Sequence, residues 1–544
     1  MDNSSLSWAM PVALRPHVPS TDKSHEIIPS YRFLAYFITL AVSICSFIAV
    51  AKLKPWLKVA RSQELHERPL WYPHKDPILG LDILFAMARA VYSHRFLEVT
   101  AELISHFGGT VTYLSLGRQG VYTIDPANLY AMLSDRTRFH DFGLGATRKN
   151  SLQPLFGNGV FNSDGPVWQH HRSTLRPILA RVTTAEIDIF EIHLQKLIKS
   201  VPADGSTVDL QQVFNALALD ISTHLFMGTS TNTIHSLSDK ISPISIGQNF
   251  AAAFEHCQRA VSGIDDFSLS GLCWRILFGD RKLKRSLQKI HSFIDESIEQ
   301  ASQCFEEQSK MSPAGVNESQ TVFDKLLCQG RSKEDIKYDI LNLLSAGKDS
   351  IASFLSSTWY VICQRPDVCD NLRAEIGGLK GQRPTLEGLF KLPYLRMVLQ
   401  EVLRLYPPVA ANQRTAEVDT ILPRGGGADG KSPLHVPRGA SVGYSVYAMH
   451  RLEEFFGEDA SEFRPERWLE IKPKAAYMPF HAGPRTCLGQ HLSLCLVKYA
   501  TIRLLQYYEG VENRNVEPWQ ERLGLSCSSR HGVKVGLAAY TPAR

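Results

Sequence analysis

Apolar residues recur at helical spacing over long stretches of this chain, whereas stretches that alternate between apolar and polar residues are shorter and fewer. The helical spacing predicts helices over residues 184–198, 335–363 and 395–406, because positions three or four apart share one helix face. The alternating pattern predicts strands over residues 111–116 and 441–447. We therefore expect a mainly α fold with a small β lobe.

An uncharged apolar run near the start of the chain predicts a membrane anchor. Residues 33–51 carry no charge, and about 20 such residues span the hydrocarbon core of a bilayer. Basic residues follow directly, which places the rest of the chain in the cytosol by the positive-inside rule. A cleaved signal peptide and a buried core helix are the alternatives. The predicted organisation is a lumenal tail over 1–32, a transmembrane anchor over 33–51, a connector over 52–77 and one large domain over 78–544.

The composition is that of an ordinary globular protein and argues against several kinds of site. The net charge of +5 is too small to predict nucleic-acid binding. The ten cysteines include no CxxC pair, so we predict reduced thiols rather than zinc ligands. Residues 425–430 formally match GxGxxG, but they open no helix and lie in no βαβ unit, so we predict a turn.

The strongest chemical signal is the segment 480–489, which reads FHAGPRTCLG. A thiolate at Cys487 that ligates haem iron has to be shielded from water, and its charge favours cleavage of the O–O bond. Flanking glycines let backbone N–H groups approach such a sulfur. We expect Phe480 to pack on the loop, Arg485 to pair with a haem propionate and Gly489 to bring the next helix close to the macrocycle. A structural cysteine in a Gly-Pro turn is the alternative.

This ten-residue pattern resembles the haem-binding signature of the cytochrome P-450 superfamily. The resemblance implies the mainly α cytochrome P-450 fold with a small β lobe, here preceded by one N-terminal transmembrane helix. It implies haem b, iron protoporphyrin IX, with Cys487 as the axial thiolate ligand of the metal. It also implies a monooxygenase, which inserts one atom of dioxygen into a substrate and reduces the other to water.

An ExxR motif precedes the cysteine segment, as it does in the superfamily. Glu401 and Arg404 are three residues apart on a predicted helix and so share a face. Arg467 follows within the sequence PERW. A surface ion pair is the alternative for ExxR alone. The resemblance implies that Glu401, Arg404 and Arg467 form a buried structural triad.

A WxxxR pattern supplies candidates for haem binding. Trp168 and Arg172 lie about one helical turn apart, and the resemblance implies that they reach the two haem propionates. Plain packing of an aromatic ring with a cation is the alternative. Arg414 and Arg451 are weaker propionate candidates.

The sequence AGKDS at residues 346–350 stands in the middle of the long predicted helix 335–363. A glycine and polar side chains cost stability at such a position, which suggests a use other than packing. A helix N-cap or a solvated patch is the alternative. The resemblance implies that Asp349 and Ser350 are catalytic and pass protons to iron-bound dioxygen. Most members have threonine where this chain has Ser350, so the hydroxyl is kept and the methyl is lost.

Several segments resemble one branch of the superfamily, the fungal family that hydroxylates n-alkanes and fatty acids at the chain terminus. Relatives with this pattern also tailor polyketides and other secondary metabolites. The glycine-rich insert is the most specific element, because the superfamily as a whole lacks it. The segments are 142–145, 155–161, 419–433, 444–451 and 457–460.

The resemblance implies an apolar small-molecule substrate, and we expect an aliphatic chain from a fatty acid, an alkane or a reduced polyketide, oxidised at or near its end. Tailoring of another fungal secondary metabolite is the alternative substrate. A member that rearranges its substrate and a haem-binding scaffold of the endoplasmic reticulum are the alternative functions. The candidate substrate-pocket residues are Phe142, Leu144, Phe156, Phe161, Ala346, Val409, Ala410 and Ala411.

The chain shows no flavin or nicotinamide fold, so it needs an electron donor. The resemblance implies NADPH–cytochrome P-450 reductase as the partner, docking on basic residues near Arg485 and Lys498. Together with the anchor, this predicts a single-pass protein of the endoplasmic reticulum membrane with its catalytic domain in the cytosol. We expect no nucleic-acid partner.

Overall fold

A computed structural model of the chain describes residues 69–180, 182–235, 246–263, 280–311 and 321–539. The chain divides into two units, Met1–Ser62 and Gln63–Arg544, and the described residues all belong to the second. The predicted anchor over 33–51 and most of the predicted connector lie outside the described residues. Within the described residues, no helix is both long and apolar enough to cross a membrane.

The central element is α14 (Lys333–Gln364), a helix of 32 residues. It begins where the side chain of Ser332 accepts a hydrogen bond from the backbone N–H of Asp335, which caps the first turn. It ends at Gln364, because Pro366 opens the next helix and disfavours helical geometry at the residue before it, Arg365. The helix predicted over 335–363 is therefore confirmed.

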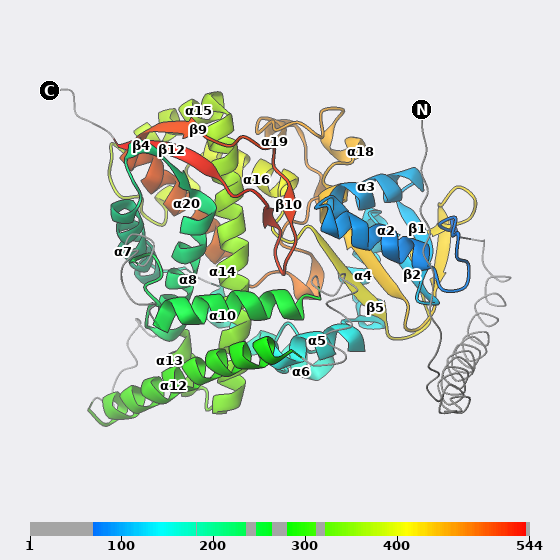
Figure 1. Cartoon of the computed structure of the whole chain (residues 1–544), viewed down its shortest axis with the longest axis horizontal. Helices are drawn as coiled ribbons and strands as arrows, with labels where there is room; N and C mark the ends of the chain where they lie inside the picture. Colours follow the sequence, from blue (N-terminus) through cyan, green and yellow to red (C-terminus); the bar gives the residue numbers. More distant parts are fainter. Residues whose placement is uncertain (1–68, 181, 236–245, 264–279, 312–320, 540–544) are drawn as a thin grey trace, which may run out of the picture. The chain divides into compact units, whose positions relative to one another are not determined.

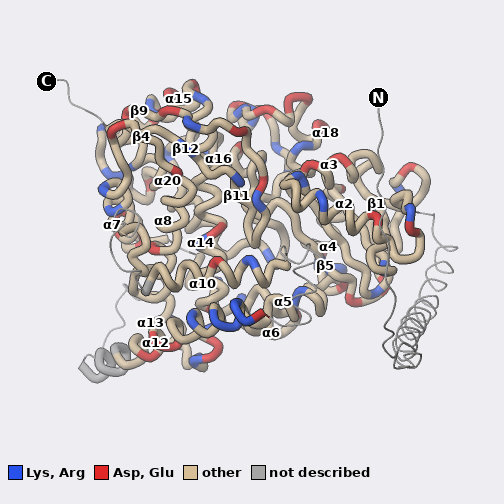
Figure 2. The backbone as a smooth tube through the Cα atoms, viewed as in Figure 1, with Lys and Arg blue, Asp and Glu red and all other residues tan. Residues whose placement is uncertain are grey.

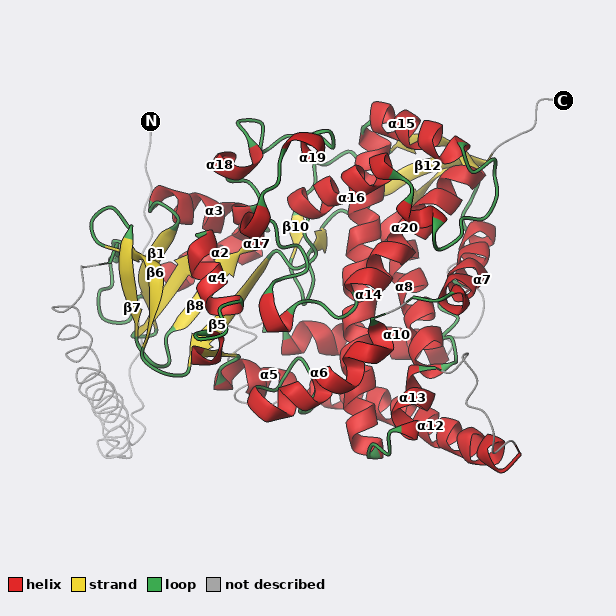
Figure 3. Cartoon of the chain, turned by 180° about the vertical axis from the view of Figure 1, so that it is seen from behind, coloured by secondary structure: helices red, strands yellow, loops and turns green. Residues whose placement is uncertain are grey.

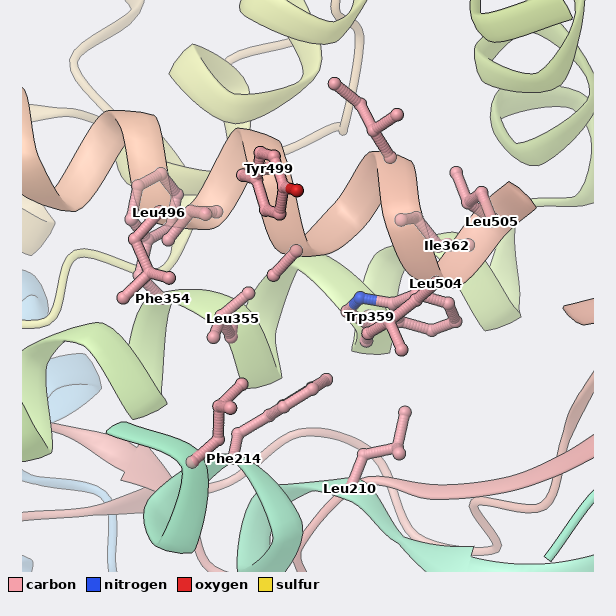
Figure 4. Close-up of a cluster of buried hydrophobic side chains, with 14 of the residues drawn as sticks. Leu210, Phe214, Phe354, Leu355, Trp359, Ile362, Leu496, Tyr499, Leu504 and Leu505 are labelled. Carbon is pink, nitrogen blue, oxygen red and sulfur yellow. The ribbon is translucent and has the colours of Figure 1, made fainter. Parts of the chain in front are cut away.

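The C-terminal half of α14 lies in the larger hydrophobic core. Phe354 and Trp359 of α14 are buried against Phe214 from one neighbouring helix and Leu504 from another (Figure 4). Each such side chain contributes about 1.5–3 kcal/mol through burial. The helices predicted over 184–198 and 395–406 are confirmed here. The helices around this half are α7 (Thr184–Ser200), α8 (Leu210–Met227), α15 (Pro366–Gly377), α16 (Pro393–Leu405) and α20 (Gln490–Tyr507).

The N-terminal half of α14 lies in a second hydrophobic core, which includes Ile336, Ile340 and Leu344. Basic residues gather along the first turns of one helix of this group, α12, whereas both charge signs mix over most of the other described elements (Figure 2). Residues 346–350 lie between the two cores. The helices of this second group are α5 (Ala146–Phe156), α6 (Gly165–Leu179), α10 (Ile246–Val261), α12 (Arg281–Met311) and α13 (Val322–Cys328).

A mixed sheet forms a lobe beside the long helices (Figures 1 and 3). β2 and β8 pair in parallel, and the other neighbours pair antiparallel. The mainly α fold with a small β lobe is thus confirmed. The strands in sheet order are β1 (Thr110–Ser115), β2 (Arg118–Thr123), β8 (Ser441–Ser445), β5 (Ala411–Ala416) and β3 (Phe142–Gly143). The helices of this lobe are α2 (Leu81–Tyr92), α3 (Phe96–His106) and α4 (Pro126–Leu133).

The two predicted strands fall in this lobe, and one of them is too long. The strand predicted over 111–116 is β1, displaced by one residue. The strand predicted over 441–447 ends at Ser445, because its hydroxyl accepts a hydrogen bond from the backbone N–H of Ala448 and caps α17 (Val446–Met449). The last two residues of that prediction are wrong, since the local cap starts a helix.

The glycine-rich insert forms the turn of a hairpin, as predicted. The backbone N–H of Gly425 donates to the carbonyl of Gly430 at 2.8 Å and closes the turn. Gly425 has φ +114°, and a Cβ there would lie 2.6 Å from the side chain of Thr110, so only glycine fits. The hairpin strands are β6 (Thr420–Gly426) and β7 (Ser432–Val436).

The remaining elements are short or lie at the edge of the helical part. The strands β4 (Asp204–Asp209), β12 (Lys534–Ala539) and β9 (Tyr508–Asn513) form one sheet, and β10 (Glu521–Arg522) pairs with β11 (Ser528–Ser529). The short helices are α18 (Glu453–Phe456) and α19 (Arg467–Glu470).

Lowering the pH from about 7 to about 4 should reduce the free energy of unfolding through two buried histidines. Burial lowers the pKa of His193 to about 4 and that of His450 to about 3. Histidine in an unfolded chain titrates near about 6.5, so in this window the unfolded chain binds protons that the folded chain does not. Urea unfolding at a series of pH values measures the slope. His193→Gln should flatten it, and His106→Gln, at an exposed position of α3, should leave it unchanged. An unaltered slope in His193→Gln would contradict this origin.

Candidate functional site

The segment 480–489, the cysteine loop, is held in one shape by its backbone. The N–H of Cys487 donates to the carbonyl of Phe480 at 3.0 Å. Gly483 has φ +68°, and a Cβ there would lie 1.8 Å from the carbonyl oxygen of Leu133 in α4. Only glycine allows this approach, so the loop is fixed closely on the end of α4.

Cys487 differs from most other cysteines because its side chain opens onto a pocket. The pocket has a volume of about 450 Å³ and is lined by α6 and the cysteine loop. Cys257, Cys363, Cys495 and other described cysteines are buried instead. Surrounding protein raises the pKa of the Cys487 thiol, while the N–H of Gly489 and the charge of Arg172 act in the opposite direction. Cys487 itself is exposed, so its sulfur is open to this pocket.

Gly489 ends the cysteine loop at the start of α20. A Cβ built on Gly489 would meet no described protein atom within 4 Å. Packing within the described protein therefore does not explain the glycine. The open space at Gly489 lies two residues from Cys487, where a flat group bound to the sulfur would need it.

Two arginines flank the indole ring of Trp168, which is buried in α6. The guanidinium of Arg485 lies 4.4 Å from the ring centroid and that of Arg172 lies 5.7 Å from it. Arg172 donates to the carbonyl of Thr486 at 2.8 Å. Arg485 forms an ion pair with Asp164 at 2.6 Å, a partner that the sequence analysis missed. The structure thus brings Trp168, Arg172 and Arg485 together around the cysteine loop.

A further cation, Arg148 of α5, joins this group although sequence reasoning did not find it. Burial, and then the positive charge of Arg414, lowers the pKa of Arg148 to about 10. Its guanidinium donates to the side chain of Asn412 at 2.8 Å. Burial also lowers the pKa of Arg485 to about 10, although the charge of Asp164 opposes this. Several guanidinium groups therefore lie close together around the cysteine loop, and their positive charge exceeds the negative charge nearby.

The two weaker propionate candidates have separate positions. Arg414 lies in β5 within the charged group just described. Arg451 stacks on the ring of Tyr447 at 3.6 Å and donates to the carbonyls of Tyr447 and Leu405. Arg451 is therefore occupied by its own local contacts.

The structure brings Glu401, Arg404 and Arg467 together as a fully buried group. Glu401 Oε1 lies 2.8 Å from Arg404 Nη2 and 2.8 Å from Arg467 Nε. The indole N–H of Trp468 and the backbone N–H of Arg464 also donate to this carboxylate, each at 3.0 Å. The carboxylate is thus saturated with donors, as a buried charge requires.

Asp349 and Ser350 lie in an unbroken stretch of α14. Ser350 Oγ donates to the carbonyl of Ala346 at 2.5 Å, one turn back along the helix. Asp349 Oδ1 lies 2.5 Å from Nζ of Lys348, a partner that the sequence analysis did not consider. A Cβ on Gly347 would lie 2.7 Å from Ser222 Oγ, which explains the glycine by close contact with α8.

The cytochrome P-450 family profile matches residues 76–532 of the chain. The chain belongs to the cytochrome P-450 family. It is 35% identical to the cytochrome P-450 monooxygenase himC of Aspergillus japonicus, over 97% of this chain and 96% of that protein. It is 33% identical to the cytochrome P-450 monooxygenase fsdH of Fusarium heterosporum, over 93% and 89%. It is 32% identical to cytochrome P-450 52A3-A of Candida maltosa, over 93% and 98%. The resemblance to fungal members of the superfamily is confirmed.

Cytochrome P-450 enzymes carry haem b on a cysteine thiolate, so this chain is a haem-thiolate monooxygenase that takes electrons from a redox partner. The residues around the cysteine loop fit this cofactor. The open side at Cys487 and Gly489 suits a flat macrocycle, and the crowded cations suit its two propionates. Trp168, Arg172, Arg414, Arg485 and the newly found Arg148 could hold these propionates.

The candidate pocket residues are spread over three apolar clusters. Phe142 lies in the core of the β lobe, whereas Phe156 lies in the core around the N-terminal half of α14. Ala410 is buried against Leu97 and Cys527, and Ala411 packs on that cluster. Leu144 is also buried, Ala346 and Val409 are half-buried, and Phe161 is exposed. Their shared role in substrate binding stays a prediction.

Lys498, which the sequence analysis placed near the docking surface, does not reach solvent. It is buried, its Nζ donates to the carbonyl of Leu389 at 3.2 Å, and it lies over the ring of Phe390. Lys498 therefore presents no charge at the surface for the predicted docking.

Protein reduced in the presence of carbon monoxide should show the red-shifted Soret band of a thiolate-ligated haem, and Cys487→Ala should abolish it. The reason is that Cys487 has its sulfur both held by the loop and open on one side. Cys328→Ala, at an exposed cysteine elsewhere, should keep the band. Persistence of the band in Cys487→Ala would place the ligand at another residue.

Proposed function

We propose that this cytochrome P-450 hydroxylates a long aliphatic chain, from a fatty acid, an alkane or a reduced polyketide, at or near its terminus. The observation that carries the proposal is an apolar segment fixed across α14. Asn342 accepts from the backbone N–H of Phe161 at 2.9 Å and donates to the carbonyl of Phe156 at 3.0 Å. Asn342 is one helical turn before Ala346 and about two turns before Asp349 and Ser350, so the segment contacts the same part of α14 as the proposed proton-transfer residues.

In this proposal the apolar candidate pocket residues recognise the substrate by burial rather than by charge. Each methylene group that leaves water contributes about 0.8 kcal/mol, so affinity rises with chain length until the cavity is full. Terminal oxidation also requires that bulky side chains keep the weaker internal C–H bonds away from the iron. The resemblance to the fungal alkane and fatty-acid hydroxylases supports the same substrate class.

The residues of the site take separate roles in this proposal. Cys487 ligates the iron, and the haem supplies activation of dioxygen. Asp349 takes up a proton on its carboxylate during turnover and gives it to Ser350. The hydroxyl of Ser350, kept in place by its bond to Ala346, passes the proton on. Glu401, Arg404 and Arg467 stabilise the fold around the cysteine loop and do not touch the substrate.

NADPH–cytochrome P-450 reductase is the electron donor in this proposal, since the sequence shows no flavin-binding or nicotinamide-binding motif. The membrane anchor predicted at 33–51 supports residence in the endoplasmic reticulum membrane beside such a donor. Because that segment lies outside the described residues, this localisation stays a prediction.

A second candidate is tailoring oxidation of another secondary metabolite. The small side chains at Ala410 and Ala411 favour it, because they leave room for a substituted chain. Ala410 is already buried against its neighbours, so Ala411, which is half-buried in β5, is the position that decides between the two substrates.

Asp349→Asn should lower product formation by about 100-fold, the lower range of general acid–base contributions, while haem and substrate binding persist. Ser350→Ala should raise peroxide release per NADPH, and Ser350→Thr should keep product formation. Product and peroxide are measured together with NADPH consumption. Unchanged product yield in both Asp349→Asn and Ser350→Ala would reject the relay.

A homologous series of fatty acids and alkanes should bind more tightly with each added methylene until the cavity is full. The shift of the haem spin state measures binding, and product analysis across lipids and polyketides measures activity. Ala411→Phe should weaken the binding of branched substrates more than that of straight-chain substrates. Tight binding of a compact polycyclic compound without any dependence on chain length would contradict the chain-oxidation proposal and leave the monooxygenase assignment intact.

A further inference from the structure

A lysine is buried in the middle of α14 beside the two residues assigned to proton transfer. Lys348 is 7% exposed, and its Nζ lies 2.5 Å from Asp349 Oδ1. Among the described residues, Asp349 is its hydrogen-bond and ion-pair partner. A buried ammonium is costly unless it is paired, so the lysine needs this carboxylate.

The pair is not a contact that helix geometry supplies by default. Adjacent residues on a helix do not face each other, whereas residues three or four apart do. The residues at those distances from Lys348 are Leu344, Ser345, Ile351 and Ala352, and none is acidic. The long lysine side chain must therefore turn back to reach Asp349.

The two relay residues are held by different partners. Ser350 donates to the carbonyl of Ala346, and Asp349 is bound to Lys348. The side chain of Asp349 is 22% exposed, compared with 8% for Lys348, so the carboxylate is the more accessible member of the pair. Its orientation relative to Ser350 consequently depends on the lysine.

We propose that Lys348 is a positioning residue for proton delivery: its ion pair with Asp349 sets the position from which that carboxylate works with Ser350. This inference rests on the proposed function, in which Asp349 and Ser350 carry protons. In productive turnover, substrate, dioxygen, two electrons from NADPH and two protons yield hydroxylated substrate and water. In unproductive turnover, the same electrons and protons leave as hydrogen peroxide. Loss of the lysine charge should shift turnover from the first outcome to the second.

The test compares Lys348→Met, which keeps length and loses charge, with Lys348→Arg, which keeps charge. Lys348→Met should lower product per NADPH by about ten-fold, a size typical of coupled neighbouring residues, with a matching rise in peroxide. Lys348→Arg should restore most of the product. The substrate-induced spin-state shift and the carbon monoxide spectrum should stay as in the parent protein. Lys337→Met is the matched control, because Lys337 lies on the same helix but forms its ion pair with Asp295, at 2.8 Å, and not with a relay residue.

A double-mutant cycle shows whether Lys348 acts through Asp349. Lys348→Met should add little to the loss of product already caused by Asp349→Asn, because the partner is gone. Urea unfolding of the same four proteins gives a readout independent of turnover. The shift of the urea unfolding midpoint in the double variant should be smaller than the sum of the shifts in the two single variants.

Three results would overturn the inference: normal coupling in Lys348→Met, an equal defect in Lys348→Arg, or additive effects in the cycle. A defect in Asp349→Asn with normal Lys348→Met would remove the lysine alone and leave the relay standing. Normal product yield and coupling in both Asp349→Asn and Ser350→Ala would instead remove the relay and this inference together. If Lys348→Met fails to retain haem, Lys348→Gln takes its place in the same comparisons.

Discussion

The buried carboxylate of Glu401 is the interaction on which the rest of the site depends. It is bound by Arg404 and Arg467, and the triad is fully withdrawn from solvent. Arg404 also donates to the carbonyl of His450, and the ring of His450 accepts from the backbone N–H of Met478, two residues before the cysteine loop. Removing one partner of such a buried pair costs about 3–5 kcal/mol. The carboxylate therefore links α16 to the chain that leads into the loop of Cys487.

α14 provides the second constraint, because it joins two hydrophobic cores at the point where its polar residues lie. Apolar side chains hold each half of the helix, and residues 346–350 occupy the junction. The close contact at Gly347 brings the helix against α8, and Asn342 attaches the segment around Phe156 and Phe161. A rigid helix with a polar centre can thus present Asp349 and Ser350 at a fixed place.

Charge is the third constraint, and it links elements that are far apart in the sequence. Arg148, Arg414 and Arg485 come from α5, β5 and the cysteine loop. Burial, and then the positive charge of Arg414, lowers the pKa of Arg148, and the charges of Arg414 and Arg148 add to the lowering that burial causes at Arg485. Grouping like charges in a buried region is unfavourable unless anions are present. The two propionates of haem b would supply such anions in a cytochrome P-450, with these arginines as the residues that would hold them.

The sequence by itself determined the features that lie within one local segment. The loop around Cys487, the ExxR pair of Glu401 and Arg404, and the long helices could be predicted because their residues are neighbours in the chain or recur at helical spacing. The end of the strand at Ser445 could not, because a side-chain cap outweighed the alternating pattern. Tertiary structure decided that Arg148 joins the cations of the cysteine loop, because Arg148 in α5 and Arg414 in β5 are too far apart in the sequence for any residue pattern to predict their contact. It also decided that Lys348 binds Asp349. Helix geometry alone does not predict this pair, because adjacent residues on a helix do not face each other.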